Sequence, residues 1–505
     1  MGSESPLHIY SVPASSGLEV DQQESTPSAL HFKWIVGILL LYFAGRLVFY
    51  SVTISGFVPP DEVTHLGLSR IFSEVLLFPE NSSDTYRYGL VTNVPWLYYW
   101  VMGKLLLLNV VGASDLVFLR LLNIPFVFGT VYFVWRLLRL LTTDRLSQIL
   151  PIVFMTNTSM FSFLSASISY DNLTNLLAAM SLYYLLAFFQ NRSADMLVGS
   201  LLCQLAGCIT KTSFLPLSFI LILLLLIHEF RNFRGFGPAI MAYLHHGNWR
   251  SYGLLAATLF CFLLNLQLYG GNLLRYKKLA PDMSVVLSLE IALKNRIAAR
   301  DMIFTLFKEQ RISYEQALDM STVIDHPGDR ADAIDLVQNY VKHVNSGATL
   351  LSPLSYIVPW TTKMLSGIFG ISGHRSMYSY WLTNLSIVIL MALTALAMLV
   401  RWRPRKDHVL PSLLALVVAF YGLFLMYVVN YRIYADTAYF PLALQGRYLF
   451  PVLGPIYVLC CYYLLRLFNN GYARLLLSAA AAFVFIASDF PFFLTHVMPE
   501  WFFHG

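Results

Sequence analysis

Two adjacent carboxylates, Asp61 and Glu62, follow a pair of prolines at the end of the first long apolar segment. A carboxylate in the middle of a bilayer costs about 2.5–3.5 kcal/mol, and two successive prolines interrupt a helix. We therefore expect both acids at the water-facing rim of a membrane helix, where Asp61 can accept a proton from a hydroxyl group. The alternative is that they only cap the following helix, because carboxylates stabilise helix N-termini.

Other polar groups are predicted at the same end of the membrane helices, although they are far apart in the sequence. They are Arg120, Asp171, Lys211, Gln445, Arg447 and Tyr448. Two carboxylate positions that face several cations suit an anionic substrate linked to a lipid. The cations would bind its phosphate, and the acid would take a proton from the attacking hydroxyl group.

Each of these residues also has a structural interpretation. Asp171 could cap the helix that follows it, and Arg120 could pair with a structural acid. Lys211 and Arg447 could extend to lipid headgroups. His65, four residues after Asp61, could share a divalent metal with it or be a structural histidine. No cluster of metal ligands is evident in the sequence, and metal dependence is left open.

Residues 96–100 read Trp-Leu-Tyr-Tyr-Trp. Because Trp and Tyr favour the headgroup level of a bilayer, and Lys104 interrupts the apolar run, we predict an interfacial helix rather than a span. Tyr98 and Tyr99 could also stack on a sugar ring, so both are candidate substrate-binding residues.

The composition predicts the elements that must position these residues. The chain is 57% hydrophobic and 12% charged, whereas soluble domains carry about 25% charged residues. Many apolar runs approach the roughly 20 residues that cross a bilayer. The expected fold is therefore all-α, a polytopic bundle of transmembrane helices. No Walker A, Rossmann, HExxH or GxSxG motif occurs, and no basic, aromatic-interleaved stripe indicates nucleic-acid binding.

Apolar length predicts eleven spans, at 34–54, 116–138, 147–167, 172–190, 195–210, 212–229, 252–270, 379–400, 409–429, 448–467 and 474–490. Every short Lys/Arg cluster then falls on one side, which predicts a cytoplasmic N-terminus. The predicted domains are a disordered cytoplasmic tail (1–33), an N-terminal membrane module (34–270), an outer helical loop (271–378) and a C-terminal membrane module (379–505).

The outer loop is predicted to be helical. Amphipathic helices are expected at Ser284–Lys308, at Ser313–Met320 with a Ser313/Gln316 capping box, and at Asp329–Asn345 with Gly347 at its end. The apolar, aromatic stretch Tyr356–Trp360 is expected on the membrane surface or over a groove.

Several motifs resemble GT-C-type polytopic glycosyltransferases in order and in topological place. They are Pro59-Pro60-Asp61-Glu62, Val94-Pro95-Trp96-Leu97-Tyr98-Tyr99, Leu119-Arg120-Leu121 and Ser169-Tyr170-Asp171-Asn172. Gln445-Gly446-Arg447-Tyr448 resembles the signature of a bacterial subgroup of predicted membrane proteins of unknown function. The chain departs from the family pattern at Trp96, where a second proline is usual, and at Val63-Thr64-His65, where Pro-Ala-His is more common.

The resemblance implies inverting transfer of a sugar from a polyprenyl-phosphate donor to a lipid or glycan acceptor, at the outer face of a bacterial inner membrane. Asp61 would be the general base and Glu62 its supporting acid, and Arg447, Lys211 and Arg120 would bind the lipid phosphate. Two alternatives remain at this point: a transporter or flippase of a lipid-linked glycan, and a non-catalytic assembly factor.

Overall fold

The computed structural model describes residues 29–110, 112–230, 243, 245, 247–347, 349–401 and 409–503. Within these ranges the regular secondary structure is helical, apart from two isolated β-bridges, Ile54–Phe502 and Ile371–Met377. The all-α fold predicted from the composition is confirmed. Most of the predicted N-terminal tail lies outside the described residues, and the first helix begins at Ala29 rather than at 34.

The first half of the chain contains α1 (Ala29–Thr53), α2 (Glu62–Glu74), η1 (Tyr86–Tyr88), α3 (Leu97–Leu106), α4 (Asp115–Arg139), α5 (Arg145–Thr156), α6 (Ser159–Ser165), α7 (Tyr170–Asn191), α8 (Ala194–Cys208), η2 (Thr212–Phe214), α9 (Leu215–Phe230), α11 (Trp249–Asn265), η3 (Leu266–Gly270) and α12 (Gly271–Tyr276). The predicted outer loop contains α13 (Met283–Val286), α14 (Leu289–Ala292), α15 (Arg296–Lys308), α16 (Tyr314–Ser321), α17 (Pro327–Ser346) and α18 (Pro353–Phe369). The last part contains α19 (Trp381–Arg401), α20 (Val409–Leu423), η5 (Phe424–Tyr431), α21 (Arg432–Thr437), η6 (Gly446–Leu449), α22 (Phe450–Leu464), η7 (Leu465–Leu467), α23 (Gly471–Ser488), α24 (Phe490–His496) and η8 (Pro499–Trp501).

Among the described residues, nine helices are long and apolar enough to cross a membrane. They coincide with nine of the eleven predicted spans. The other two predicted spans correspond to shorter apolar helices: 195–210 to α8, and 147–167 to α5 and α6, between which Asn157 and Thr158 interrupt the helix. The predicted interfacial segment forms the short helix α3, which is not among the nine.

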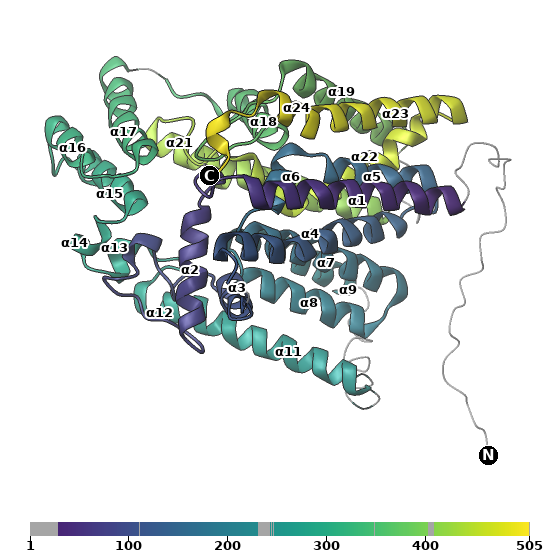
Figure 1. Cartoon of the computed structure of the whole chain (residues 1–505), viewed down its shortest axis with the longest axis horizontal. Helices are drawn as coiled ribbons and strands as arrows, with labels where there is room; N and C mark the ends of the chain where they lie inside the picture. The colour runs from purple at the N-terminus through teal and green to yellow at the C-terminus, as the bar shows by residue number, and fades with distance from the viewer. Residues whose placement is uncertain are drawn as a thin grey trace.

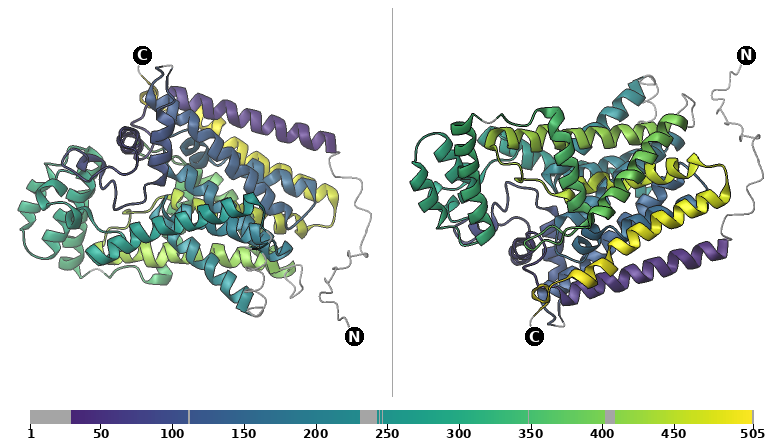
Figure 2. Two further views of the ribbon diagram at one scale, coloured as in Figure 1. Left: turned by 90° about the horizontal axis from the view of Figure 1, so that it is seen from below. Right: turned by 90° about the horizontal axis from the view of Figure 1, so that it is seen from above.

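The apolar helices lie side by side and alternate in direction (Figures 1 and 2). One end of the bundle carries α2 and the helices α15, α16 and α17, and we call it the site end. Helix α1 ends there, beside the C-terminal end of the described chain, and α4 begins there, where Asp115 pairs with Arg70 of α2 (Figure 1). This alternation brings residues from distant turns to one end of the molecule.

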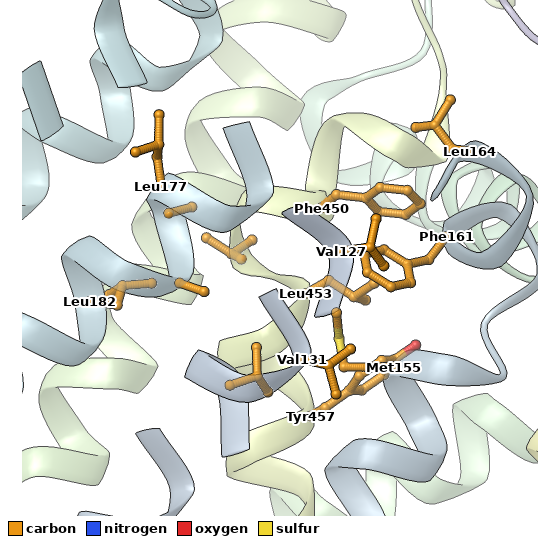
Figure 3. Close-up of a cluster of buried hydrophobic side chains, with 14 of the residues drawn as sticks. Val127, Val131, Met155, Phe161, Leu164, Leu177, Leu182, Phe450, Leu453 and Tyr457 are labelled. Carbon is orange, nitrogen blue, oxygen red and sulfur yellow. The ribbon is translucent and has the colours of Figure 1, made fainter. Parts of the chain in front are cut away.

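Two helices form the centre of the bundle. In the most apolar 18-residue stretch of each helix, 78% of the residues are buried in Tyr170–Asn191 and likewise in Gly446–Leu467, against 11% in Trp381–Arg401. Figure 3 shows α22 side chains Phe450, Leu453 and Tyr457 packed among residues of α4, α5, α6 and α7. The exposed apolar faces of peripheral helices such as α19 are those expected to contact lipid, since lipid is as apolar as these side chains.

The outer loop differs from the prediction in one element. The single helix expected at Ser284–Lys308 is three helices, α13, α14 and α15, and the last begins at the capping residue Asn295, whose side chain accepts hydrogen bonds from two backbone N–H groups. The Ser313/Gln316 capping box is confirmed. Gly347 ends α17 in the left-handed conformation, as expected.

The aromatic stretch Tyr356–Trp360 lies in α18, which packs against η5 and η6. Trp360 donates a hydrogen bond from its indole N–H to Asn430 Oδ1 (2.9 Å). The stretch therefore packs on η5, and the following part of α18, at Met364 and Gly367, lies against Gly446, next to Arg447.

Candidate functional site

Asp61 is the N-cap residue of α2 and has a left-handed backbone (φ 59°). Non-glycine residues adopt this conformation uncommonly, and Asp tolerates it better than most. The carboxylate makes no capping hydrogen bond to α2, so the structure does not support helix capping as its role. The Asp61 N–H instead donates to His374 Nε2 (3.3 Å).

Two arginines hold the Asp61 carboxylate. Arg447 Nη2 donates to Oδ2 (2.9 Å), and Arg296 Nη2 donates to Oδ1 (3.2 Å). The Asp61 side chain remains 30% exposed, whereas that of Arg447 is 2% exposed. Asp61 is therefore the group of this ion pair that a molecule from outside can reach.

A second acid lies on the other side of Arg447. Asp171 forms an ion pair with Lys211, and its Oδ2 is 3.7 Å from Arg447 Nη1. Asp171 does not cap α7, because Ser169 Oγ accepts the hydrogen bond from the backbone N–H of Asp171. The sequence-based prediction that Asp61, Asp171, Lys211 and Arg447 converge is confirmed by these contacts.

Arg447 Nη1 lies in ion-pair distance of Asp171 but makes no hydrogen bond. Its Nε donates to Gln445 Oε1 (2.6 Å), but Nη1 is buried and makes no hydrogen bond. Leaving a buried donor unpaired costs about 1–3 kcal/mol, and more for a charged group. The Nη1 group can therefore serve as a donor for an anion that enters the site.

Two glycines allow these segments to approach. A Cβ atom at Gly446 would lie 2.6 Å from Met364 O, so only glycine lets the Arg447 segment lie against α18. A Cβ atom at Gly373 would lie 2.5 Å from Val58 O. The loop that carries His374 is thereby seated on the proline turn that precedes Asp61.

Glu62 and Arg120 form a separate pair behind the site. Arg120 Nε and Nη2 donate to the two carboxylate oxygens of Glu62 (2.8 and 2.5 Å), and Arg120 Nη1 donates to the carbonyls of Ser51 (3.1 Å) and Ile54 (2.6 Å). Both side chains are at most 1% exposed. This geometry matches the structural interpretation of Arg120, and the pair fixes the end of α1 to α2 and α4.

Aromatic rings line the cationic side of the site. Lys211 Nζ lies over the rings of Tyr170 (4.5 Å) and Tyr448 (5.2 Å). The Tyr99 hydroxyl is 2.9 Å from His65 Nδ1. Tyr98 is fully buried and donates to Asn123 Oδ1 (3.0 Å), so in this structure its ring presents no exposed face.

Burial and neighbouring charges shift the pKa values of three groups of the site that lie outside the membrane-spanning helices. Burial raises the pKa of Asp61, but attraction to Arg447 and Arg296 outweighs burial and holds this pKa well below its usual value. Burial lowers the pKa of Lys211, against the effect of Asp171. Burial also lowers the pKa of His65 to about 4, so this imidazole is neutral at pH 7.

The sequence-based prediction missed Arg296 and His374, both of which contact Asp61. They come from the outer loop, in which the sequence predicts helices but not their packing. Asn295 was a local signal, because asparagine is a favoured N-cap residue and α15 begins at the next residue, Arg296. Among the described residues, no group of three or more His, Cys, Asp or Glu side chains could hold a metal ion.

No protein-family model matches the chain, and neither does any curated protein. Three solved structures align over most of it. AglB, the archaeal oligosaccharyltransferase from Archaeoglobus fulgidus solved with an inhibitory peptide and a dolichol-phosphate, has 12% identity and a TM-score of 0.44 over 91% of this chain. ArnT from Cupriavidus metallidurans, bound to undecaprenyl phosphate, has 12% identity and a TM-score of 0.35 over 93%. The arabinosyltransferase EmbB from Mycobacterium smegmatis has 11% identity and a TM-score of 0.33 over 88%.

This chain covers 55% of the AglB chain, 81% of the ArnT chain and 42% of the EmbB chain. Each TM-score is below 0.5, so the likeness to these three proteins is weak.

Proposed function

We propose that the protein is a GT-C-type membrane glycosyltransferase that moves a sugar from a polyprenyl-phosphate donor to a lipid or glycan acceptor. The observation that carries the proposal is the reachable Asp61 carboxylate held beside the buried cations Arg447 and Lys211. An acid that accepts a proton and cations that neutralise a departing phosphate are the two requirements of this reaction.

In the proposed reaction, an acceptor hydroxyl oxygen forms a bond to the anomeric carbon while the bond from that carbon to the phosphate oxygen breaks. The hydroxyl proton passes to Asp61, and the negative charge of the polyprenyl phosphate is stabilised by Arg447 and Lys211. Attack from the face opposite the phosphate inverts the anomeric carbon.

The two arginines on Asp61 make its carboxylate a weak base in the empty site, because they hold its pKa low. A donor phosphate bound by Arg447 adds negative charge beside Asp61 and competes for the same guanidinium group. Both effects raise the pKa of Asp61. Donor binding would thus strengthen the base at the moment when the acceptor needs it.

In this proposal the site end of the bundle faces the outside of a bacterial inner membrane and the N-terminus is cytoplasmic. The basis is the distribution of Lys and Arg, which the positive-inside rule assigns to the cytoplasm. The protein would then act in the assembly of a cell-envelope glycan or polysaccharide.

The test is sugar transfer by the purified chain in proteoliposomes, with labelled polyprenyl-phosphate sugars and candidate lipid acceptors. Asp61→Asn keeps the shape of the side chain but removes the base, and we expect about 10²- to 10⁴-fold slower turnover. Asp115→Asn is the matched control, since Asp115 is 32% exposed and pairs with Arg70 near the start of α4.

Unchanged transfer by Asp61→Asn would show that Asp61 is not the base. Movement of the labelled lipid across the bilayer without transfer of its sugar would instead support the transporter alternative.

A further inference from the structure

His65 is a buried histidine whose second ring nitrogen has no partner. It is 2% exposed, its Nδ1 is 2.9 Å from the Tyr99 hydroxyl, and its Nε2 makes no hydrogen bond. The main-chain N–H of His65 donates to Asp61 O (2.9 Å), so the histidine lies one helical turn after the proposed base. An unpaired buried polar atom next to a site is a candidate contact for a ligand.

The surroundings of the ring place it in the candidate site. The charged groups that act on His65 are Asp61, Arg447, Asp171 and Lys211, the four groups already described. The imidazole and the Tyr170 ring pack in a T-shaped arrangement (centroids 4.6 Å apart), and Lys211 Nζ lies 4.5 Å from the centroid of the same ring. His65 and Lys211 therefore both contact one tyrosine ring.

The hydrogen bond to Tyr99 determines which nitrogen carries the proton. Within the described part of the chain, His65 is the one hydrogen-bond partner of the Tyr99 hydroxyl. If Tyr99 donates to Nδ1, the proton of the neutral ring is on Nε2, and only this N–H is unpaired. If Nδ1 donates instead, both the tyrosine proton and Nε2 are unpaired. Each unpaired buried group costs about 1–3 kcal/mol, so the first arrangement is favoured.

We propose that neutral His65 donates a hydrogen bond from Nε2 to an oxygen of the substrate phosphate, with Tyr99 as the positioning residue that fixes this tautomer. The proposal rests on the proposed function, which supplies the phosphate. It adds an uncharged donor to the site, besides Arg447 Nη1, which also makes no hydrogen bond. A neutral donor can bind the phosphate without adding a further positive charge that would weaken Asp61 as a base.

The first test measures binding of undecaprenyl phosphate, undecaprenol and inorganic phosphate to the full-length chain in nanodiscs. We expect wild type to bind undecaprenyl phosphate more tightly than the other two. His65→Phe keeps the ring shape without a donor, and should weaken binding of undecaprenyl phosphate about ten- to hundredfold while leaving undecaprenol unaffected. His65→Gln, which retains an N–H donor, should restore most of the affinity.

The second test observes the tautomer by NMR of the protein with ¹⁵N-labelled histidine rings, with the His65 signal identified by its absence in His65→Gln. Wild type should show Nε2–H, and Tyr99→Phe should show a mixture of both tautomers. Tyr457→Phe is the matched control, because Tyr457 is also buried and its hydroxyl is bonded to one side chain, Thr158, away from the site.

The outcomes separate the two proposals. If wild type binds undecaprenyl phosphate no better than undecaprenol, the proposed function fails and this proposal fails with it. If wild type prefers the phosphate but His65→Phe binds it equally well, only the role of His65 is overturned. A spectrum with the proton on Nδ1 would also overturn it, whether or not the variants fold well enough to bind lipid.

Discussion

The buried pair Glu62–Arg120 gives the sharpest quantitative prediction. In Arg120→Met the carboxylate of Glu62 keeps one hydrogen bond, from the Ile168 N–H (2.8 Å), and loses its counter-charge in a site without solvent. In Glu62→Gln, Arg120 keeps its hydrogen bonds to the carbonyls of Ser51 and Ile54, and the amide oxygen can replace one of the carboxylate oxygens as an acceptor. Removal of one partner of a buried pair costs about 3–5 kcal/mol. We expect Arg120→Met near the upper value and Glu62→Gln near the lower one.

The double variant distinguishes a structural pair from two independent functional residues. With both side chains neutral, no buried charge is left uncompensated, so the combined cost should be lower than the sum of the single costs by about 2–3 kcal/mol. Reversible unfolding in mixed micelles, followed by tryptophan fluorescence, measures the three free energies. Transfer assays on the folded variants measure the KM for the donor.

Additive costs, within about 0.5 kcal/mol, would refute the structural coupling. An Arg120→Met protein of normal stability with a strongly raised KM for the donor would assign Arg120 to the lipid phosphate instead.

Two more variants test the contacts around Asp61. Arg296→Gln removes one of the two cations that lower the pKa of Asp61, so this pKa rises and the acidic limb of the kcat/KM profile should move to higher pH. Arg300→Gln, on the same helix and without a contact to Asp61, should leave the profile in place. Gly446→Ala should lower both stability and activity, because its Cβ meets the backbone of α18, whereas Gly422→Ala, with nothing within 4 Å, should be tolerated. An unshifted acidic limb or a fully active Gly446→Ala protein would contradict these expectations.

The lengths of the apolar segments were sufficient to predict most of the bundle, because a helix that crosses a bilayer needs about 20 apolar residues. The same pattern predicted the convergence at the site. Alternating spans bring the turns before Asp171 and before Arg447 to the same end, whatever their separation in sequence. The capping box at Ser313 was predictable because its hydrogen bonds join residues three apart.

The sequence analysis named Asp61 as the base and Glu62 as its supporting acid, but it did not predict that the two adjacent acids contact different arginines. Asp61 contacts Arg447 and Arg296, while Glu62 contacts Arg120, and the left-handed backbone at Asp61 separates their directions. The loop at Gly373 and His374 contacts the proline turn and the Asp61 N–H, and only the fold brings the two segments together. Arg296 was missed for the same reason, since its partner is 235 positions away.

The partners of Asp61 also constrain the biosynthesis of the protein. Arg447 is 386 positions after Asp61, so the ribosome has translated most of the chain before this ion pair can form. Until then Asp61 and Asp171 lack the guanidinium group that neutralises them both in the folded protein. A nascent chain arrested between residues 296 and 447 can therefore pair Asp61 only with Arg296 and Asp171 only with Lys211, so the guanidinium group that joins the two acids is added last.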